Sequence, residues 1–82
     1  MKALDLDLLL LLRAAKQYGL STENLLPLLR AGQHRQLTAP ALDRALRALA
    51  DLATIVPMPG ALGGIRWRLT ALGRSYLEEA GT

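Results

Sequence analysis

Three charged side chains lie close together in segment 38–53 and carry groups that can read base pairs. Arg44 and Arg47 have guanidinium groups, which donate hydrogen bonds to a guanine edge or to a phosphate. Asp43 has a carboxylate, which can accept a hydrogen bond from the amino group of cytosine. A plainer alternative is that Asp43 pairs with Arg47 four residues later, an exposed ion pair worth about 0.3 kcal/mol on a helix. The two arginines are therefore the stronger candidates for contact with a nucleic acid.

Polar side chains before and after this segment extend the candidate surface. Arg35 and Gln36 lie in the preceding turn, where contacts with the phosphate backbone would set the register. Arg66 and Arg68 alternate with apolar residues, so one face of a strand would carry both charges. The candidate DNA-binding residues are Arg35, Gln36, Thr38, Pro40, Asp43, Arg44, Arg47, Arg66 and Arg68.

The sequence offers no comparable set of residues for catalysis or for a metal ion. His34 is the single histidine, cysteine is absent, and no glycine-rich loop precedes a helix in the form of a phosphate cradle. A lone histidine without further ligands is more often a surface or turn residue than a metal ligand. We therefore expect no enzyme activity, no cofactor and no metal site.

Length and composition indicate one domain, residues 1–82, with a core made mainly of leucine. Hydrophobic residues make up 51% of the chain, but only one tryptophan and two tyrosines are aromatic. The leucine run 8–12 is too short to cross a bilayer and follows Asp5 and Asp7, where a signal peptide would carry positive charge. Because the absence of cysteine also fits a reducing compartment, we expect a cytoplasmic protein that does not bind a membrane.

The net charge of +3 is small, but the positive charge is concentrated in one part of the chain. Residues 1–29 hold three cations and three carboxylates, whereas residues 30–74 hold seven arginines against Asp43 and Asp51. This distribution favours contact with a nucleic acid. The alternative is that scattered arginines only keep a leucine-rich domain soluble.

Apolar residues at helical spacing predict a first helix over residues 4–18, ended by Gly19. Its core-facing stripe is expected to be Leu4, Leu8, Leu11, Leu12, Ala15 and Tyr18. Further leucines fall outside this stripe and form a second apolar face, which we expect to bind a second copy or another protein. Alternatively, the last helix packs over this face within the monomer. The residues of the candidate interface are Leu6, Leu9, Leu10 and Arg13.

Two further helices are predicted from their capping residues. Ser21, Thr22 or Asn24 can begin the second helix. Pro27 favours Asn24, because proline is best tolerated in the first turn. Thr38 is predicted to begin the third helix, the most regular amphipathic segment of the chain.

The spacing changes from helical to alternating after residue 53. Segments 54–56 and 65–69 predict the two strands of a hairpin, joined by a loop rich in glycine and proline. Thr70 is then predicted to cap a closing helix. The predicted fold is therefore mainly α with a small β-hairpin. The apolar side of the closing helix is expected to carry Leu72, Tyr76 and Ala80.

This arrangement resembles the winged helix-turn-helix domain of PadR- and MarR-type regulators over about residues 4–79. Its sharpest part is the motif Leu-Thr-x-x-Gly-Arg at 69–74, directly after the hairpin. The resemblance implies a three-helix core, a two-stranded wing and a C-terminal helix. It also implies a symmetric dimer that inserts its third helix into the major groove of DNA. Many members carry cations at the wing tip, whereas residues 58–64 carry none, so any wing contact is expected from the strand arginines.

Two functions of different classes follow from these patterns. The first is a small DNA-binding transcriptional regulator, favoured by the charge distribution and by the resemblance. The second is a winged-helix interaction module without DNA binding, which would use the apolar wing tip and the second leucine face of the first helix. The uncharged wing tip and the small number of cations on the third helix favour the second function.

Overall fold

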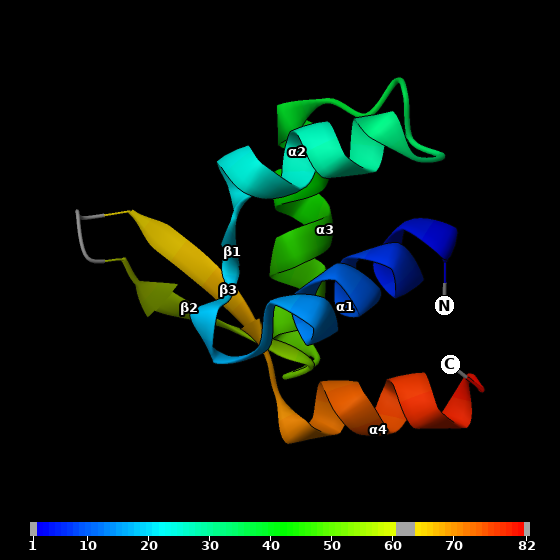
Figure 1. Cartoon of the computed structure of the whole chain (residues 1–82), viewed down its shortest axis with the longest axis vertical. Helices are drawn as coiled ribbons and strands as arrows, with labels where there is room; N and C mark the ends of the chain where they lie inside the picture. Colours follow the sequence, from blue (N-terminus) through cyan, green and yellow to red (C-terminus); the bar gives the residue numbers. More distant parts are fainter. Residues whose placement is uncertain (1, 61–63, 82) are drawn as a thin grey trace.

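The computed structural model describes residues 2–60 and 64–81, and within them the chain forms four α-helices and a three-stranded antiparallel sheet (Figure 1). The prediction of a mainly helical chain with a small hairpin is confirmed at this level. Part of the predicted wing tip, residues 61–63, lies outside the described residues. The elements in chain order are α1 (Ala3–Ala15), the 3₁₀ helix η1 (Lys16–Tyr18), β1 (Leu20–Ser21), α2 (Thr22–Ala31), α3 (Ala39–Asp51), β2 (Ile55–Pro59), β3 (Ile65–Leu69) and α4 (Ala71–Glu79).

The sheet has β3 at its centre, with β1 and β2 paired antiparallel on either side. The pair β2 and β3 forms the predicted hairpin, and Ile55 lies opposite Leu69. The predicted bounds 54–56 of its first strand are wrong, because β2 begins at Ile55 and continues through Pro57 to Pro59. The expectation of only two strands is wrong, because Leu20 also lies opposite Trp67 and Ser21 follows it into the sheet. A strand of two residues is too short to show alternation, so only the tertiary pairing reveals it.

The core is built mainly from leucine, as the composition predicts. All four α-helices and both hairpin strands contribute to one cluster of buried side chains. Because a domain of this size buries a limited share of its surface, each helix must supply part of this cluster. Its members are Leu8, Leu9, Leu12, Leu25, Leu29, Leu42, Leu46, Leu49, Ile55, Trp67, Leu69 and Leu77.

The predicted caps of α3 and α4 are confirmed. The hydroxyl oxygen of Thr38 accepts a hydrogen bond from the amide of Ala41 at 3.3 Å. The hydroxyl oxygen of Thr70 accepts one from the amide of Gly73 at 3.1 Å. Each bond satisfies an amide that has no partner within its own helix, which is why these two starts follow from local sequence.

The start of α2 differs from the prediction, because Ser21 rather than Asn24 is its cap. The hydroxyl oxygen of Ser21 accepts a hydrogen bond from the amide of Asn24 at 3.2 Å. Pro27 therefore lies inside the helix, where the amide that it lacks would have bonded to the carbonyl of Glu23. Pairing in the sheet explains this early start, since Ser21 is also the residue opposite Arg66.

The core-facing stripe predicted for the first helix fails at Tyr18, which is 70% exposed. The regular helix ends at Ala15, and Lys16 has a φ of 55°. Helical spacing therefore no longer decides which side Tyr18 faces.

The apolar side predicted for α4 is also wrong. Leu72, Tyr76 and Ala80 are exposed, whereas Gly73 and Leu77 are buried. The buried side is set by Gly73, because only a residue without a side chain fits the close approach of α4 to the sheet.

The junction between α3, the sheet and α4 is closed by hydrogen bonds. Thr70 donates its hydroxyl to the carbonyl of Ala53 at 2.6 Å and its amide to the carbonyl of Thr54 at 3.0 Å. The buried hydroxyl of Thr54 donates to the carbonyl of Leu49 at 2.8 Å. A β-carbon at Gly73 would collide with the carbonyl oxygen of Thr54 and with the side chain of residue 69.

We predict that Gly73→Ala lowers the free energy of unfolding by about 2 to 3 kcal/mol, because the added methyl meets backbone that cannot move aside. Urea denaturation measures this change. Gly64→Ala is the matched control. A β-carbon at Gly64 meets no atom of the described residues within 4 Å, so the change should alter stability by less than about 0.5 kcal/mol. Equal effects of the two substitutions would contradict the close contact at Gly73.

Candidate nucleic-acid interface

The side of α3 opposite its buried leucines carries the candidate base-reading residues. Arg44 and Arg47 are exposed, and Asp43 is half-buried. The Nε of Arg47 donates a hydrogen bond to Oδ2 of Asp43 at 2.8 Å, so the ion pair considered as the plainer alternative is present. The side chain of Arg44 makes no hydrogen bond or ion pair to any of residues 2–60 or 64–81. Arg44 is thus the more available of the two arginines.

The residues before α3 form its entry turn. Arg35, Gln36 and Pro40 are exposed, and Thr38 uses its hydroxyl as the helix cap. Arg30 supports this turn, because its Nε donates to the carbonyl of residue 37 at 2.8 Å. No local pattern indicates this bond, which joins the end of α2 to the turn before α3.

A hydrogen bond between distant residues also holds this turn. The Nε2 of His34 lies 2.6 Å from Oδ2 of Asp7 on α1, and both side chains are partly buried. The expectation that His34 is a turn residue agrees with this position. Asp7 is 27 residues away along the chain, so no local pattern indicates this pair.

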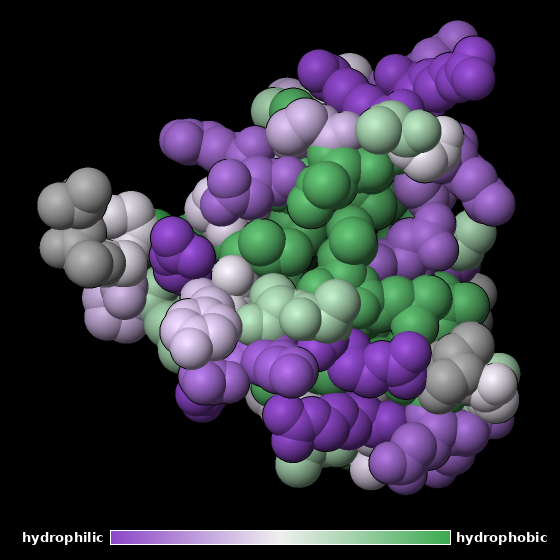
Figure 2. Space-filling model, viewed as in Figure 1, coloured by the Kyte–Doolittle hydropathy of each residue, from purple (hydrophilic) through white to green (hydrophobic). Residues whose placement is uncertain are grey.

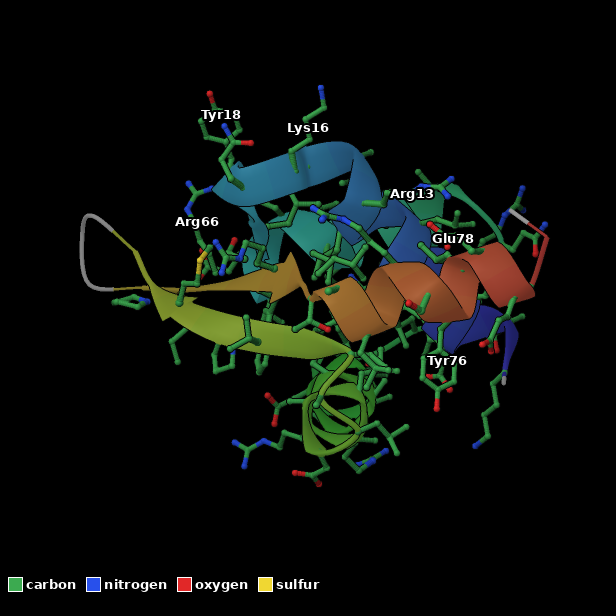
Figure 3. All side chains as sticks on the ribbon, turned by 90° about the horizontal axis from the view of Figure 1, so that it is seen from below. Arg13, Lys16, Tyr18, Arg66, Tyr76 and Glu78 are labelled. Atoms are coloured by element: carbon green, nitrogen blue, oxygen red, sulfur yellow. The ribbon has the colours of Figure 1, made fainter. Side chains whose placement is uncertain are left out.

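The two strand arginines lie on the outer face of the sheet. Trp67 and Leu69 point into the core, so the alternation of β3 turns Arg66 and Arg68 the other way. Figure 3 places Arg66 beside Tyr18, on the side of the sheet away from α3. Its NH1 lies 3.5 Å from the carbonyl oxygen of Tyr18. The structure therefore separates the nine candidate residues into an α3 group and a β3 group.

Trp67 belongs to the core, as its place on the apolar face predicts. It is 8% exposed, and its indole Nε1 donates to the hydroxyl oxygen of Thr22 at 3.3 Å. A tryptophan held in this way does not offer a face for stacking on a base.

The expectation of a second exposed leucine face on the first helix is wrong for Leu9, which is fully buried. Leu6 and Leu10 are partly buried against the core cluster, and Arg13 is exposed. The packing of α4 alongside α1 explains this, because it encloses α1 from a second side (Figure 1). This is the alternative that the sequence left open.

An apolar groove nevertheless remains between α1 and α2. Leu10 and Leu11 line it from α1, and Leu28 and Leu29 line it from α2. Leu28 is 48% exposed. Figure 2 shows a continuous hydrophobic surface across these two elements. The candidate interface is therefore the groove between α1 and α2, and not the single face of α1 that the sequence predicted.

No group of three or more potential metal ligands gathers among the described residues. No helix in that part of the chain is long and apolar enough to cross a membrane. Comparisons with protein families, with curated proteins and with solved structures found no match to this chain.

Proposed function

We propose that this protein is a small, cytoplasmic, DNA-binding transcriptional regulator that inserts α3 into the major groove. The observation that carries the proposal is the side of α3 with Arg44 free, opposite a stripe of buried leucines. Three helices followed by a strand pair and a closing helix also support a winged helix-turn-helix domain.

In this proposal each group of residues has a distinct role. Arg44 donates to a base edge, and Arg47 reaches a base or a phosphate once it leaves Asp43. Arg35 and Gln36, in the entry turn, contact the phosphate backbone and set the register. Small residues at the start of α3, including Pro40, let the helix approach the groove closely.

A homodimer formed along the groove between α1 and α2 would place two copies of α3 in one assembly. A single copy offers few cations to the duplex, and a second copy doubles the phosphate contacts. Leu28, which is 48% exposed, and the partly buried Leu10 supply apolar surface for such a contact.

The second candidate function is a protein-interaction module without DNA binding. The apolar groove favours it, because the same leucines could receive a helix of another protein. The pairing of Arg47 with Asp43 favours it too, since the ion pair leaves fewer free cations on α3.

We predict that Arg44→Ala/Arg47→Ala weakens binding to random duplex DNA by about tenfold or more, because each arginine supplies a contact worth about 1 to 3 kcal/mol. Fluorescence polarisation at two salt concentrations measures the affinity and its salt dependence. Lys2→Ala/Arg13→Ala is the charge-matched control, since both cations are exposed, one just before α1 and one within it, outside α3 and outside the β3 strand. Two results would favour the interaction module instead. They are no DNA binding by the wild type, and an unchanged affinity in the Arg44→Ala/Arg47→Ala variant.

We predict that Asp43→Asn strengthens binding to the same duplex by about threefold, because it frees Arg47 and removes one negative charge from the surface of α3. Asp51→Asn is the control: it removes an equal charge from the same helix, but Asp51 is not the partner of Arg47. A loss of affinity in Asp43→Asn would instead mean that the carboxylate itself contacts DNA.

We predict that Leu28→Glu converts a dimer into a monomer in light scattering without loss of folding, because the side chain is half exposed in the single chain. Leu9→Glu is the contrasting variant and should unfold the domain, since a charge would enter the core. A wild-type protein that stays monomeric at high micromolar concentration would rule out the homodimer.

A further inference from the structure

A second cluster of cations lies in a hollow away from the outward side of α3. The end of α1, the end of β3 and the start of α4 meet there, and each supplies or adjoins one cation: Lys16, Arg68 and Arg74. Gln17 and Thr70 also line the hollow, and no acidic side chain is among its described lining residues.

These three cations have no partner among the described residues, unlike several other arginines of the domain. Arg30, Arg47 and Arg66 all donate to oxygen atoms of the protein. Within residues 2–60 and 64–81, the side chains of Lys16, Arg68 and Arg74 make no hydrogen bond or ion pair. Three like charges around one hollow repel one another, so an anion placed between them would be bound favourably.

The fold fixes where each cation stands. Arg68 faces outward because its neighbours in β3, Trp67 and Leu69, face the core. Arg74 lies one turn into α4, whose start is set by the Thr70 cap, so it points to the same side as the end of β3. These two positions depend on the hydrogen-bonded junction and not on flexible loops.

Lys16 completes the hollow from an unusual backbone conformation. Its φ of 55° and ψ of −137° are values that glycine adopts more readily than other residues. Figure 3 shows its side chain at the η1 edge, extended into solvent. Its long flexible stem lets the ammonium reach a ligand from the rim.

We propose that this hollow binds the phosphate group of a small phosphorylated molecule. The guanidinium groups of Arg68 and Arg74 can each donate two hydrogen bonds to phosphate oxygens, and Lys16 adds a compact positive charge. Thr70 does not act as a donor here, because its hydroxyl already donates to the carbonyl of Ala53.

The position of the hollow favours the phosphate of a small molecule over a phosphate of DNA. Arg68 lies on the outer face of the sheet, whereas α3 packs on the side that carries the core. A duplex bound along the outward side of α3 would contact the residues of α3 and of its entry turn, and not those of the hollow. The hollow therefore suits a separate, small ligand, and it does not depend on DNA binding by α3.

The test is isothermal titration calorimetry of the full chain with inorganic pyrophosphate at low ionic strength. We expect saturable binding of one pyrophosphate per chain by the wild type. Lys16→Gln/Arg68→Gln/Arg74→Gln should weaken it by at least about tenfold. The control Lys2→Gln/Arg35→Gln/Arg44→Gln removes the same net charge from other surfaces and should keep the affinity within about twofold of the wild type.

Three results would overturn the proposal. They are no binding of pyrophosphate by the wild type, an equal loss in both triple variants, and a loss of duplex affinity in the hollow variant as large as that of Arg44→Ala/Arg47→Ala. The last result would assign the phosphate to DNA. Pyrophosphate binding without any duplex binding would keep this site while removing the proposed regulator function.

The single variant Lys16→Gly provides a second test in case the triple variant of the hollow does not fold. Glycine accepts the backbone conformation at this position, so the fold should be kept while one cation is removed. We expect several-fold weaker pyrophosphate binding, and unchanged binding in this folded variant would remove Lys16 from the site.

Discussion

The placement of both cationic surfaces depends on the hydrogen bonds between Thr70 and residues 53–54. Thr70 binds the carbonyl of Ala53 through its hydroxyl and the carbonyl of Thr54 through its amide, which ties the start of α4 to the segment that follows α3. Gly73 then lets α4 lie close to the sheet. Since these contacts fix the end of α3, the sheet and α4 together, they set the outward side of α3 and the hollow beside β3 at the same time. A change that opens the junction would disturb both surfaces.

The features that could be predicted from the sequence are those fixed by neighbouring residues. The Thr38 and Thr70 caps depend on amides within three residues, and the hairpin depends on alternation within short segments. The features that could not be predicted require partners far away in the chain. The cap of α2 follows from the pairing of Ser21 with Arg66, and the burial of Leu9 follows from the packing of α4 against α1. In the candidate interface, helical spacing correctly placed the arginines of α3 on the outward side. The hollow could not be predicted, because its three cations come from elements that are far apart in the sequence.

The small net charge conceals two different electrostatic environments. On α3, Asp43 forms an ion pair with Arg47, whereas Arg44 is not part of this pair. Beside β3, Lys16, Arg68 and Arg74 share a hollow whose described lining has no carboxylate. Because exposed charges are screened over about 10 Å at ordinary salt, what matters for a ligand is the local arrangement and not the sum over the chain. An excess of positive charge in the sequence therefore indicates only that the chain attracts polyanions. Which cations are paired with carboxylates in the fold decides where on the surface an anion can bind.

The apolar groove between α1 and α2 has a physical cause in the leucine core. Because α1 is enclosed by α4 on one side and by α2 and α3 on the other, most of its leucines are needed within the domain. The groove persists where the chain leaves α2, since the hydrogen bond between His34 and Asp7 holds the following turn against α1. These two polar groups line the same groove as Leu10 and Leu28. The groove thus has a fixed polar end and an apolar floor, so a partner that fills it must bring both an apolar side chain and a group that tolerates the histidine–carboxylate pair.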